Sequence, residues 1–246
     1  MATNASRRRR SPRTPGPRSS AGESLVARTP AGELLHVALP RVTSALRATV
    51  ARLRLSHELP DRFGVVSAIR GEGVTFISRS LALVLANDTR EKVCLVDFNF
   101  RHPARLGAGF EGRPGLAEVL RGSASLHDAL AATADPALTI LPAGTATVEE
   151  PPVFASSPEL EMVLEDLDRR YEHMVIDLPS LHASSEALTL ASHATGVAVV
   201  VRQGVTSEAQ VKAALEELEG VPVLGVVLNA FETKVPAAIA RRFPTT

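Results

Sequence analysis

The chain has 246 residues, of which 45% are hydrophobic and 22% charged, so it is long enough to bury one large core and has a globular composition. Its formal net charge is zero, which excludes a strong overall attraction to nucleic acid or acidic lipid. A single cysteine, Cys94, excludes an internal disulfide and favours a reducing cytoplasm. No apolar run approaches the ~20 residues of a membrane span.

Residues 1–32 are rich in Arg, Pro, Ser and Gly and contain few large apolar groups. Such a composition buries too little surface to order itself, so we expect a disordered basic tail followed by a single domain over residues 33–246. The alternative for this tail is a basic arm for anionic lipid or nucleic acid. Nothing aromatic is interleaved there for stacking on bases, so nucleic acid is not the expected partner.

The rest of the chain alternates between helical and strand-like segments. Apolar residues at helical spacing predict a first helix over residues 41–57. Strands are predicted at 63–68, 92–98, 138–143, 173–179, 196–202 and 223–230. Helices are predicted at 75–87, 157–171, 184–194 and 206–219, with short helical pieces at 115–122 and 125–130. Continuously apolar strands that alternate with helices predict an α/β fold, a mostly parallel sheet sandwiched by helices in three layers.

A glycine-rich turn, residues 68–73, joins the first predicted strand to a helix within the segment SAIRGEGVTF. Gly71 and Gly73 allow the backbone N–H groups to point inward, and the following helix adds its partial positive charge. This arrangement predicts a cradle for nucleotide phosphates, to which Arg70 and Glu72 also belong. The lysine that such a turn normally carries is absent, since Val74 stands in its place.

Two aspartates come directly after apolar strands, Asp97 in VDFNF and Asp177 in VIDLP. A carboxylate in this position is costly unless it faces a site or a metal. Together with the hydroxyl of Thr75, these carboxylates offer the hard oxygen ligands that Mg²⁺ prefers. The sequence therefore predicts a Mg²⁺-nucleotide site at the carboxyl ends of the strands.

Three segments resemble, in order, the motifs of the cytoplasmic bacterial tyrosine kinases of capsule and exopolysaccharide systems. SAIRGEGVTF resembles SAIPGEGKST, CLVDFNFRHP (94–103) resembles LLIDADLRRP, and MVIDLPS (174–180) resembles VIIDTPP. These kinases belong to the wider class of P-loop ATPases that includes the septum-site and chromosome-partitioning ATPases. The likeness covers roughly residues 42–230. It implies a P-loop NTPase-like domain with Asn229 on the adenine ring and, because the lysine is missing, at most weak binding of Mg-ATP or Mg-ADP.

The chain also departs from this family. Val74 replaces the phosphate lysine, and Asn99 replaces an aspartate thought to help activate the attacking group. The family's tyrosine-rich tail is missing, because Tyr171 is the only tyrosine and we expect it to pack in the core. The family's subunit-contact motif, Glu-x-x-Arg-x-x-Arg, keeps only Arg47, which leaves self-association as an open expectation.

Three hypotheses follow. The first is a catalytically inactive, kinase-like regulator of exopolysaccharide or capsule polymerisation and export, held at the inner membrane by a membrane polysaccharide co-polymerase or adaptor protein. The second is a weakly active ATP-dependent tyrosine kinase or ATPase that uses Arg70 or a partner's residue in place of the lysine. The third is a partitioning-type module that binds DNA or membrane.

Overall fold

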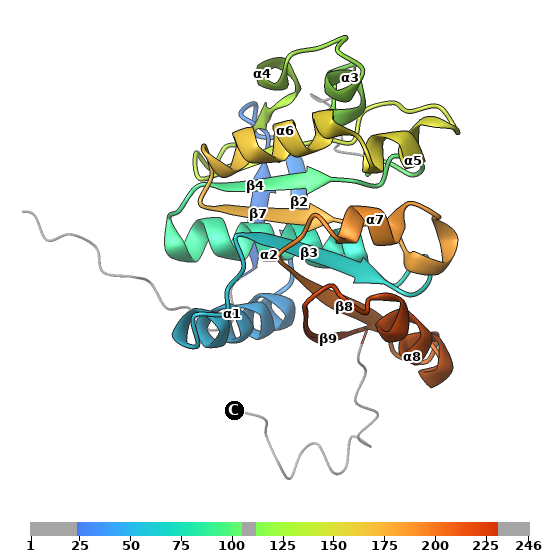
Figure 1. Cartoon of the computed structure of the whole chain (residues 1–246). Helices are drawn as coiled ribbons and strands as arrows, with labels where there is room; N and C mark the ends of the chain where they lie inside the picture. The colour runs from blue at the N-terminus through green and yellow to red at the C-terminus, as the bar shows by residue number, and fades with distance from the viewer. Residues whose placement is uncertain (1–23, 105–111, 231–246) are drawn as a thin grey trace, which may run out of the picture.

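The computed structural model describes residues 24–104 and 112–230, and it contains a central sheet with helices on both faces (Figure 1). Seven strands have the spatial order β5-β6-β4-β7-β3-β8-β9, and all neighbours are parallel except β5 and β6. The strands are β3 (Arg62–Ser67), β4 (Val93–Asp97), β5 (Ala131–Ala132), β6 (Leu138–Leu141), β7 (His173–Asp177), β8 (Gly196–Arg202) and β9 (Val223–Asn229). The predicted α/β fold and its six strands are confirmed, and β5 is an addition.

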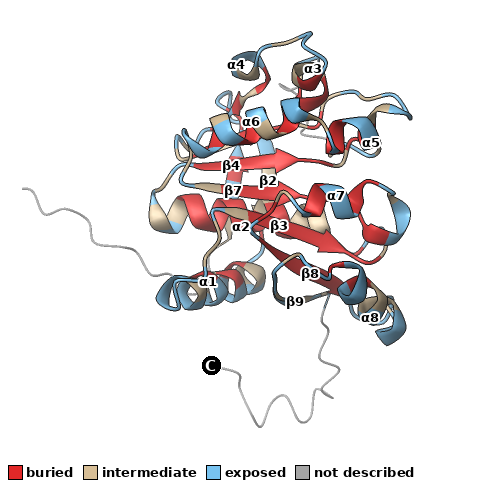
Figure 2. Cartoon of the chain, viewed as in Figure 1, coloured by how far each residue is buried: buried red, intermediate tan, exposed pale blue. Residues whose placement is uncertain are grey.

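Alternate residues of the strands enter two separate cores, which Figure 2 shows as buried strands between more exposed helices. Val65 and Leu95 pack toward α1 (Pro40–Leu55) and α2 (Val74–Thr89) on one face. Val66 and Val96 pack into the core of the opposite face. The helices of that face are α3 (Leu116–Leu120), α4 (Leu126–Ala129), α5 (Glu150–Ala155), α6 (Pro158–Asp168), α7 (Ala187–Ala191) and α8 (Glu208–Glu217), with a 3₁₀ turn η1 (Leu181–Ala183).

Helix α2 lies deepest in the molecule and sets the position of the glycine-rich turn. Its residues from Leu81 to Ala86 are all buried, as expected for a helix that is covered on every side. It packs on the sheet with one side, and its other sides contact α1 and a small β-hairpin. Because α2 is fixed along its whole length, its N-terminus holds a defined place over the carboxyl edge of the sheet.

The β-hairpin consists of β1 (Leu25–Arg28) and β2 (Leu34–Ala38), which pair antiparallel. His36 Nε2 lies 2.8 Å from Ser80 Oγ of α2, and burial beside Arg79 lowers the pKa of His36 to about 4. The predicted tail boundary at residue 32 is therefore wrong for Leu25–Arg28, because contacts with α2 order a segment whose own composition does not. Residues 1–23 lie outside the described part of the chain.

The edge strand β9 differs from the expectation of strands covered on both faces. Val226 and Leu228 are 52% and 49% exposed, because side chains project from the faces of a sheet and no described helix packs closely on β9. Helix α7 is also shorter than the predicted segment 184–194, since η1 and a turn take up the preceding residues. Within residues 24–104 and 112–230, no helix combines the length and apolar character needed to cross a bilayer.

Candidate functional site

The glycine-rich turn has the geometry that the sequence predicts. It connects the end of β3 to the start of α2, and Gly71 and Gly73 have φ angles of +83° and +100°. A Cβ on Gly73 would lie 2.2 Å from Asn229 Nδ2, so both conformation and space require glycine there. No side chain caps the N-terminus of α2, and its first turn holds no acidic residue. Its first N–H groups therefore remain available to an anion.

Glu72 fastens the turn to the ends of two distant strands, to β8 through its carboxylate and to β9 through its backbone carbonyl. It is fully buried and accepts hydrogen bonds from the backbone N–H of Ile69 at 2.8 Å, from that of Arg202 at 3.3 Å, and from the Thr206 hydroxyl. Asn229 Nδ2 donates to the Glu72 carbonyl oxygen at 2.8 Å. The side chains of Glu72 and Asn229 thus hold the shape of the turn.

A small hollow of about 180 Å³ opens inside the turn, and we call it the turn hollow. It is lined by Ser67, Arg70, Gly71, Gly73, Val74, Thr75 and Ser180. Five of these residues are predicted from the sequence, whereas Ser67 and Ser180 are not. Arg70 is the one charged side chain in this lining, and no carboxylate belongs to it.

Asp97 and Asp177 lie side by side beneath the turn, because they are register partners at the ends of β4 and β7. Both are buried, with 5% and 3% of their surface exposed. Burial and the neighbouring Asp97 charge raise the pKa of Asp177 to about 8, although Thr75 and Ser78 of α2 act in the opposite direction. Ser78 Oγ lies 3.4 Å from Asp177 Oδ1.

The Asp97 carboxylate is held by backbone groups of the loop that follows β4. The N–H of Asn99 donates to Oδ1 at 2.8 Å, and the N–H of Ala104 donates to Oδ2 at 2.9 Å. Burial raises the pKa of Asp97 against the effect of these two hydrogen bonds and of the Arg79 guanidinium. Arg79, one turn beyond Thr75 on α2, also acts on Asp177, and the sequence reasoning missed it.

The donor set formed by Thr75, Asp97 and Asp177 fits Mg²⁺, which prefers few carboxylates and retains water. Two buried carboxylates in register are costly when both are ionised, and a divalent cation would remove this cost. Bound there with a nucleotide, Mg²⁺ would supply charge to the phosphate oxygens. The residues predicted to hold it are therefore brought together by the fold.

The loop of the second motif is fixed by a buried ion pair. Arg101 Nε and Nη2 donate to the two carboxylate oxygens of Glu186 at 2.8 and 3.2 Å, and Arg101 Nη1 donates to the Val148 carbonyl at 3.1 Å. Burial alone would raise the pKa of Glu186, but the Arg101 guanidinium holds it below its ordinary value. This pair positions the loop that carries Asn99.

Arg47, the predicted subunit-contact residue, makes an ion pair within its own chain. Its Nε and Nη2 lie 2.7 and 2.9 Å from the two carboxylate oxygens of Asp88, which connects α1 to α2. A role in self-association remains a prediction, and any such contact would have to share or replace this pair.

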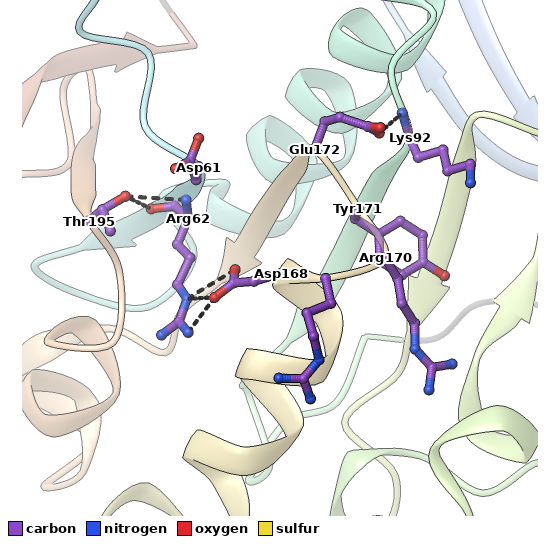
Figure 3. A pocket seen from close by; sticks show the side chains of 9 residues that line it. Asp61, Arg62, Lys92, Asp168, Arg170, Tyr171, Glu172 and Thr195 are labelled. Atoms are coloured by element: carbon purple, nitrogen blue, oxygen red, sulfur yellow. Dashed lines mark hydrogen bonds and ion pairs between the residues drawn. The ribbon is translucent and has the colours of Figure 1, made fainter.

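A wider hollow of about 690 Å³ lies at the opposite edge of the sheet, and we call it the amino-edge hollow (Figure 3). It is lined by Asp61, Arg62, Lys92, Asp168, Arg169, Arg170, Tyr171, Glu172 and Thr195. Arg62 Nη2 lies 2.6 Å from Asp168 Oδ2, and the lining carries charges of both signs. Its mixed charge and its distance from the glycine-rich turn set it apart from the candidate nucleotide site.

Tyr171 lies in this second hollow, just before β7 begins. It is half-buried and packs against the larger core, which confirms the predicted packing role. Asp177 is at the other end of β7, and a strand rises ~3.3 Å per residue, so about 13 Å of strand separates its first and last residues. The phenol therefore lies far from the turn hollow of its own chain.

These features define a class of protein. A parallel sheet, a glycine-rich turn at the start of a buried helix and paired aspartates at adjacent strand ends form a P-loop NTPase-like domain. The family model described as "Cellulose biosynthesis protein BcsQ" matches residues 63–234, and the chain belongs to this family.

Named relatives lie among bacterial tyrosine kinases and exopolysaccharide proteins. The chain is 29% identical over 161 residues to tyrosine-protein kinase ptk of Acinetobacter johnsonii, covering 64% of this chain and 22% of that one. It is 28% identical over 176 residues to tyrosine-protein kinase CpsD of Streptococcus agalactiae, covering 70% and 76%. It is 31% identical over 199 residues to succinoglycan biosynthesis transport protein ExoP of Rhizobium meliloti, covering 77% and 25%. The chain thus spans about a quarter or less of ptk and ExoP.

Solved structures agree with this placement. The kinase domain of VpsO has a TM-score of 0.67 at 30% identity, with 78% of this chain and 97% of that chain covered. The septum site-determining protein MinD of Pyrococcus horikoshii, solved with Mg-ADP, has a TM-score of 0.56 at 24% identity, with 75% and 77% covered. The second likeness shows the shared fold alone.

Proposed function

We propose that this chain is a kinase-like regulatory domain of an exopolysaccharide or capsule system and that it transfers no phosphate itself. The observation that carries the proposal is the glycine-rich turn, which keeps its shape while Val74 begins α2 where the phosphate lysine is expected. The Mg²⁺ donor set and the anchoring of the turn are also retained. Because the turn keeps its shape around the uncharged Val74, a role in binding or regulation is better supported than phosphate transfer.

The missing lysine has a large expected effect on catalysis. A unit charge pair near 4 Å contributes roughly 4 kcal/mol at an effective dielectric of 20, which corresponds to about a thousandfold. Valine supplies none of this stabilisation. Asn99 in the second motif removes a proton acceptor as well, because an amide does not act as a general base. Two separate parts of phosphoryl transfer are thus altered.

The position of the possible phosphate acceptor also supports a protein that transfers no phosphate. The one tyrosine, Tyr171, is half-buried at the amino edge of the sheet, away from the turn hollow. Relatives named for kinase activity and for succinoglycan transport support a place in polysaccharide export. We therefore assign as partner a membrane polysaccharide co-polymerase or adaptor, which would hold this domain at the inner membrane on its cytoplasmic side.

The test is a phosphotransfer assay of the full chain with Mg-ATP, alone and with the cytoplasmic segment of its co-polymerase. We expect no phosphate on either protein, whereas the two proteins bind each other in calorimetry. Val74→Lys is the matched variant, and its gain of Mg-ATP affinity would show that the cradle is intact. Phosphate transfer by the native chain, lost in Asp177→Asn, would overturn the proposal.

A second candidate function is weak ATP hydrolysis or kinase activity that depends on Arg70. The observation in its favour is that Arg70 is the charged side chain in the lining of the turn hollow. In this case Arg70→Ala abolishes hydrolysis, while Arg90→Ala, an exposed arginine at the far end of α2, leaves it unchanged. The partitioning-type alternative rests on the basic residues before Glu23, which lie outside the described part of the chain.

A further inference from the structure

Ser180 is placed against the glycine-rich turn by hydrogen bonds on both sides of it. The N–H of Leu178 donates to the Val65 carbonyl of β3 at 3.0 Å. The N–H of His182 donates to the Ala68 carbonyl, at the start of the turn, also at 3.0 Å. The short segment that carries Ser180 is thus tied to the strand and the turn that form the cradle.

Among residues 24–104 and 112–230, the hydroxyl of Ser180 has no hydrogen-bond partner, although the residue is only 7% exposed. Ser180 occupies the N-cap position of η1, where a serine side chain commonly accepts from the backbone, but here it makes no capping hydrogen bond. A buried hydroxyl without a partner costs about 1–3 kcal/mol. Such a cost is explained when the group has a partner that is bound during function.

The turn hollow in which Ser180 lies has the chemistry of an anion site. Its lining combines the hydroxyl groups of Ser67, Thr75 and Ser180 with the Arg70 guanidinium and contains no carboxylate. Two of these hydroxyl groups are already used, since Ser67 donates to the Ile69 carbonyl at 2.8 Å and the Thr75 side chain hydrogen-bonds to Asp177. The uncapped N-terminus of α2, a helix of 16 residues, adds N–H donors and partial positive charge.

We propose that the Ser180 hydroxyl donates a hydrogen bond to a phosphate group held in the turn hollow. This inference rests on the proposed function in one respect, since it takes the hollow as a retained nucleotide cradle. The phosphate belongs to a nucleotide or is free phosphate, because the same donors serve both.

Ser180 also explains how a cradle without a lysine holds an anion. In the third motif, MVIDLPS, Ser180 stands where the resembling motif VIIDTPP has its last proline, which has no donor at all. A hydroxyl added on one side of the hollow thus accompanies the loss of a charge at Val74. A neutral donor binds a phosphate oxygen but does not neutralise charge that develops on it, so such a site favours binding over transfer.

The experiment is calorimetric titration of the full chain with Mg-ADP, Mg-ATP and inorganic pyrophosphate, together with thermal unfolding without ligand. We expect Ser180→Ala and Ser180→Pro to weaken binding by roughly tenfold, which is the effect of one hydrogen bond to a charged group. Ser180→Thr keeps a hydroxyl and should restore binding. Ser184→Ala, in the same segment but outside the hollow lining, is the matched control and should bind like the native chain.

Unfolding separates a phosphate contact from a merely structural role. Removal of an unpartnered buried hydroxyl should leave the Tm of Ser180→Ala unchanged or slightly higher, whereas a structural hydroxyl would lower it. Equal affinity of the native chain and Ser180→Ala, or no binding of any of the three probes to the native chain, would overturn the inference. That result would not contradict the proposed regulatory function. Conversely, phosphate transfer by the native chain would overturn the proposed function but would not contradict the contact between Ser180 and the phosphate. Pyrophosphate binding with no nucleotide binding would identify free phosphate groups as the ligand.

Discussion

The two edges of the sheet carry hollows of opposite character. At the amino edge, Arg62 makes ion pairs with Asp168 and Glu161, and the wide hollow beside it is rimmed by mixed charges. At the carboxyl edge, the smaller turn hollow lies above two buried carboxylates, and one buried hydroxyl in its lining lacks a partner.

This difference shows that the size of a hollow is a poor guide to function. At the amino edge, Arg62, Arg169 and Arg170 are held in ion pairs with nearby carboxylates. At the carboxyl edge, Asp177 has a pKa raised to about 8, and the Ser180 hydroxyl has no hydrogen-bond partner within the described part of the chain. Groups that are costly when the protein is alone are typical of sites that become satisfied when a ligand binds. The smaller hollow is therefore the better candidate site.

The largest expected effect comes from Gly73→Ala at the carboxyl edge. The new Cβ meets Asn229 Nδ2 at 2.2 Å and requires a φ of +100°, so we expect a loss of about 3 kcal/mol in the free energy of unfolding. Urea unfolding measures this loss. Gly71→Ala is the control, since its φ is +83° but nothing lies within 4 Å, and it should lose only about 1 kcal/mol. Equal losses in the two variants would show that Asn229 does not fasten the turn.

The second prediction has the opposite sign, because Asp177→Asn should stabilise the protein at pH 8 without Mg²⁺ by roughly 2 kcal/mol. The folded-state pKa of Asp177 is raised, so the stability it contributes is present below about pH 4 and lost as the pH rises toward about 8. The variant and the native chain should therefore unfold alike near pH 4 and differ increasingly up to pH 8. Asp61→Asn, an exposed carboxylate at the other edge, controls for the loss of one negative charge. A native chain whose stability is flat between pH 4 and 8 would contradict the prediction.

At the amino edge, Arg62→Ala should cost about 1–2 kcal/mol in the free energy of unfolding. Its side chain is only 12% exposed, and the change leaves Asp168 and Glu161 without this guanidinium. Binding of Mg-ADP should not change, because the affected edge is remote from the turn. Denaturant unfolding measures the stability of this variant, and calorimetry measures its affinity for Mg-ADP. Weaker Mg-ADP binding at unchanged stability would contradict the separate roles assigned to the two edges.

The smallest effect is expected for Tyr171→Phe, which removes a phenol hydroxyl and keeps the ring in the core. Burial raises the pKa of Tyr171, while Thr139 beside the hydroxyl acts against that rise. The loss should be about 0.5–1 kcal/mol, the net contribution of one neutral hydrogen bond. Thermal unfolding provides the measurement, with Thr139→Val as the variant from the other side of the contact. Any phosphate incorporation that disappears in Tyr171→Phe would show that the amino edge takes part in chemistry.

The sequence predicts the parts of this molecule that depend on local pattern. Apolar runs identify six of the seven strands of the main sheet, and the spacing of Gly71, Gly73 and Thr75 identifies the cradle. Asp97 and Asp177 are predicted together because parallel strands bring their carboxyl ends to one edge. These inferences need only periodicity and the order of elements along the chain.

Other features depend on partners that are remote in sequence. The sequence predicts Glu72 as a residue of the phosphate cradle, but in the structure its carboxylate accepts hydrogen bonds from the Thr206 hydroxyl and the Arg202 N–H. Ser180 gives no local signal, because the absence of a hydrogen-bond partner is a property of the folded chain. The hairpin strand Leu25–Arg28 is missed for the same reason, since contacts with α2 order it.

The hydrogen bond from Asn229 to Glu72 has a consequence for folding of the chain during its synthesis. This hydrogen bond joins residues 157 positions apart, so the glycine-rich turn is synthesised well before Asn229, which holds it in place. At ~5–20 residues per second, a ribosome needs roughly 10–30 s to synthesise the intervening chain. Strand β3 gains its neighbours β7 and β8 within that interval, because both strands lie between Glu72 and Asn229 in the sequence. The side chain of Asn229 therefore reaches the glycine-rich turn only after both neighbours of β3 have been synthesised.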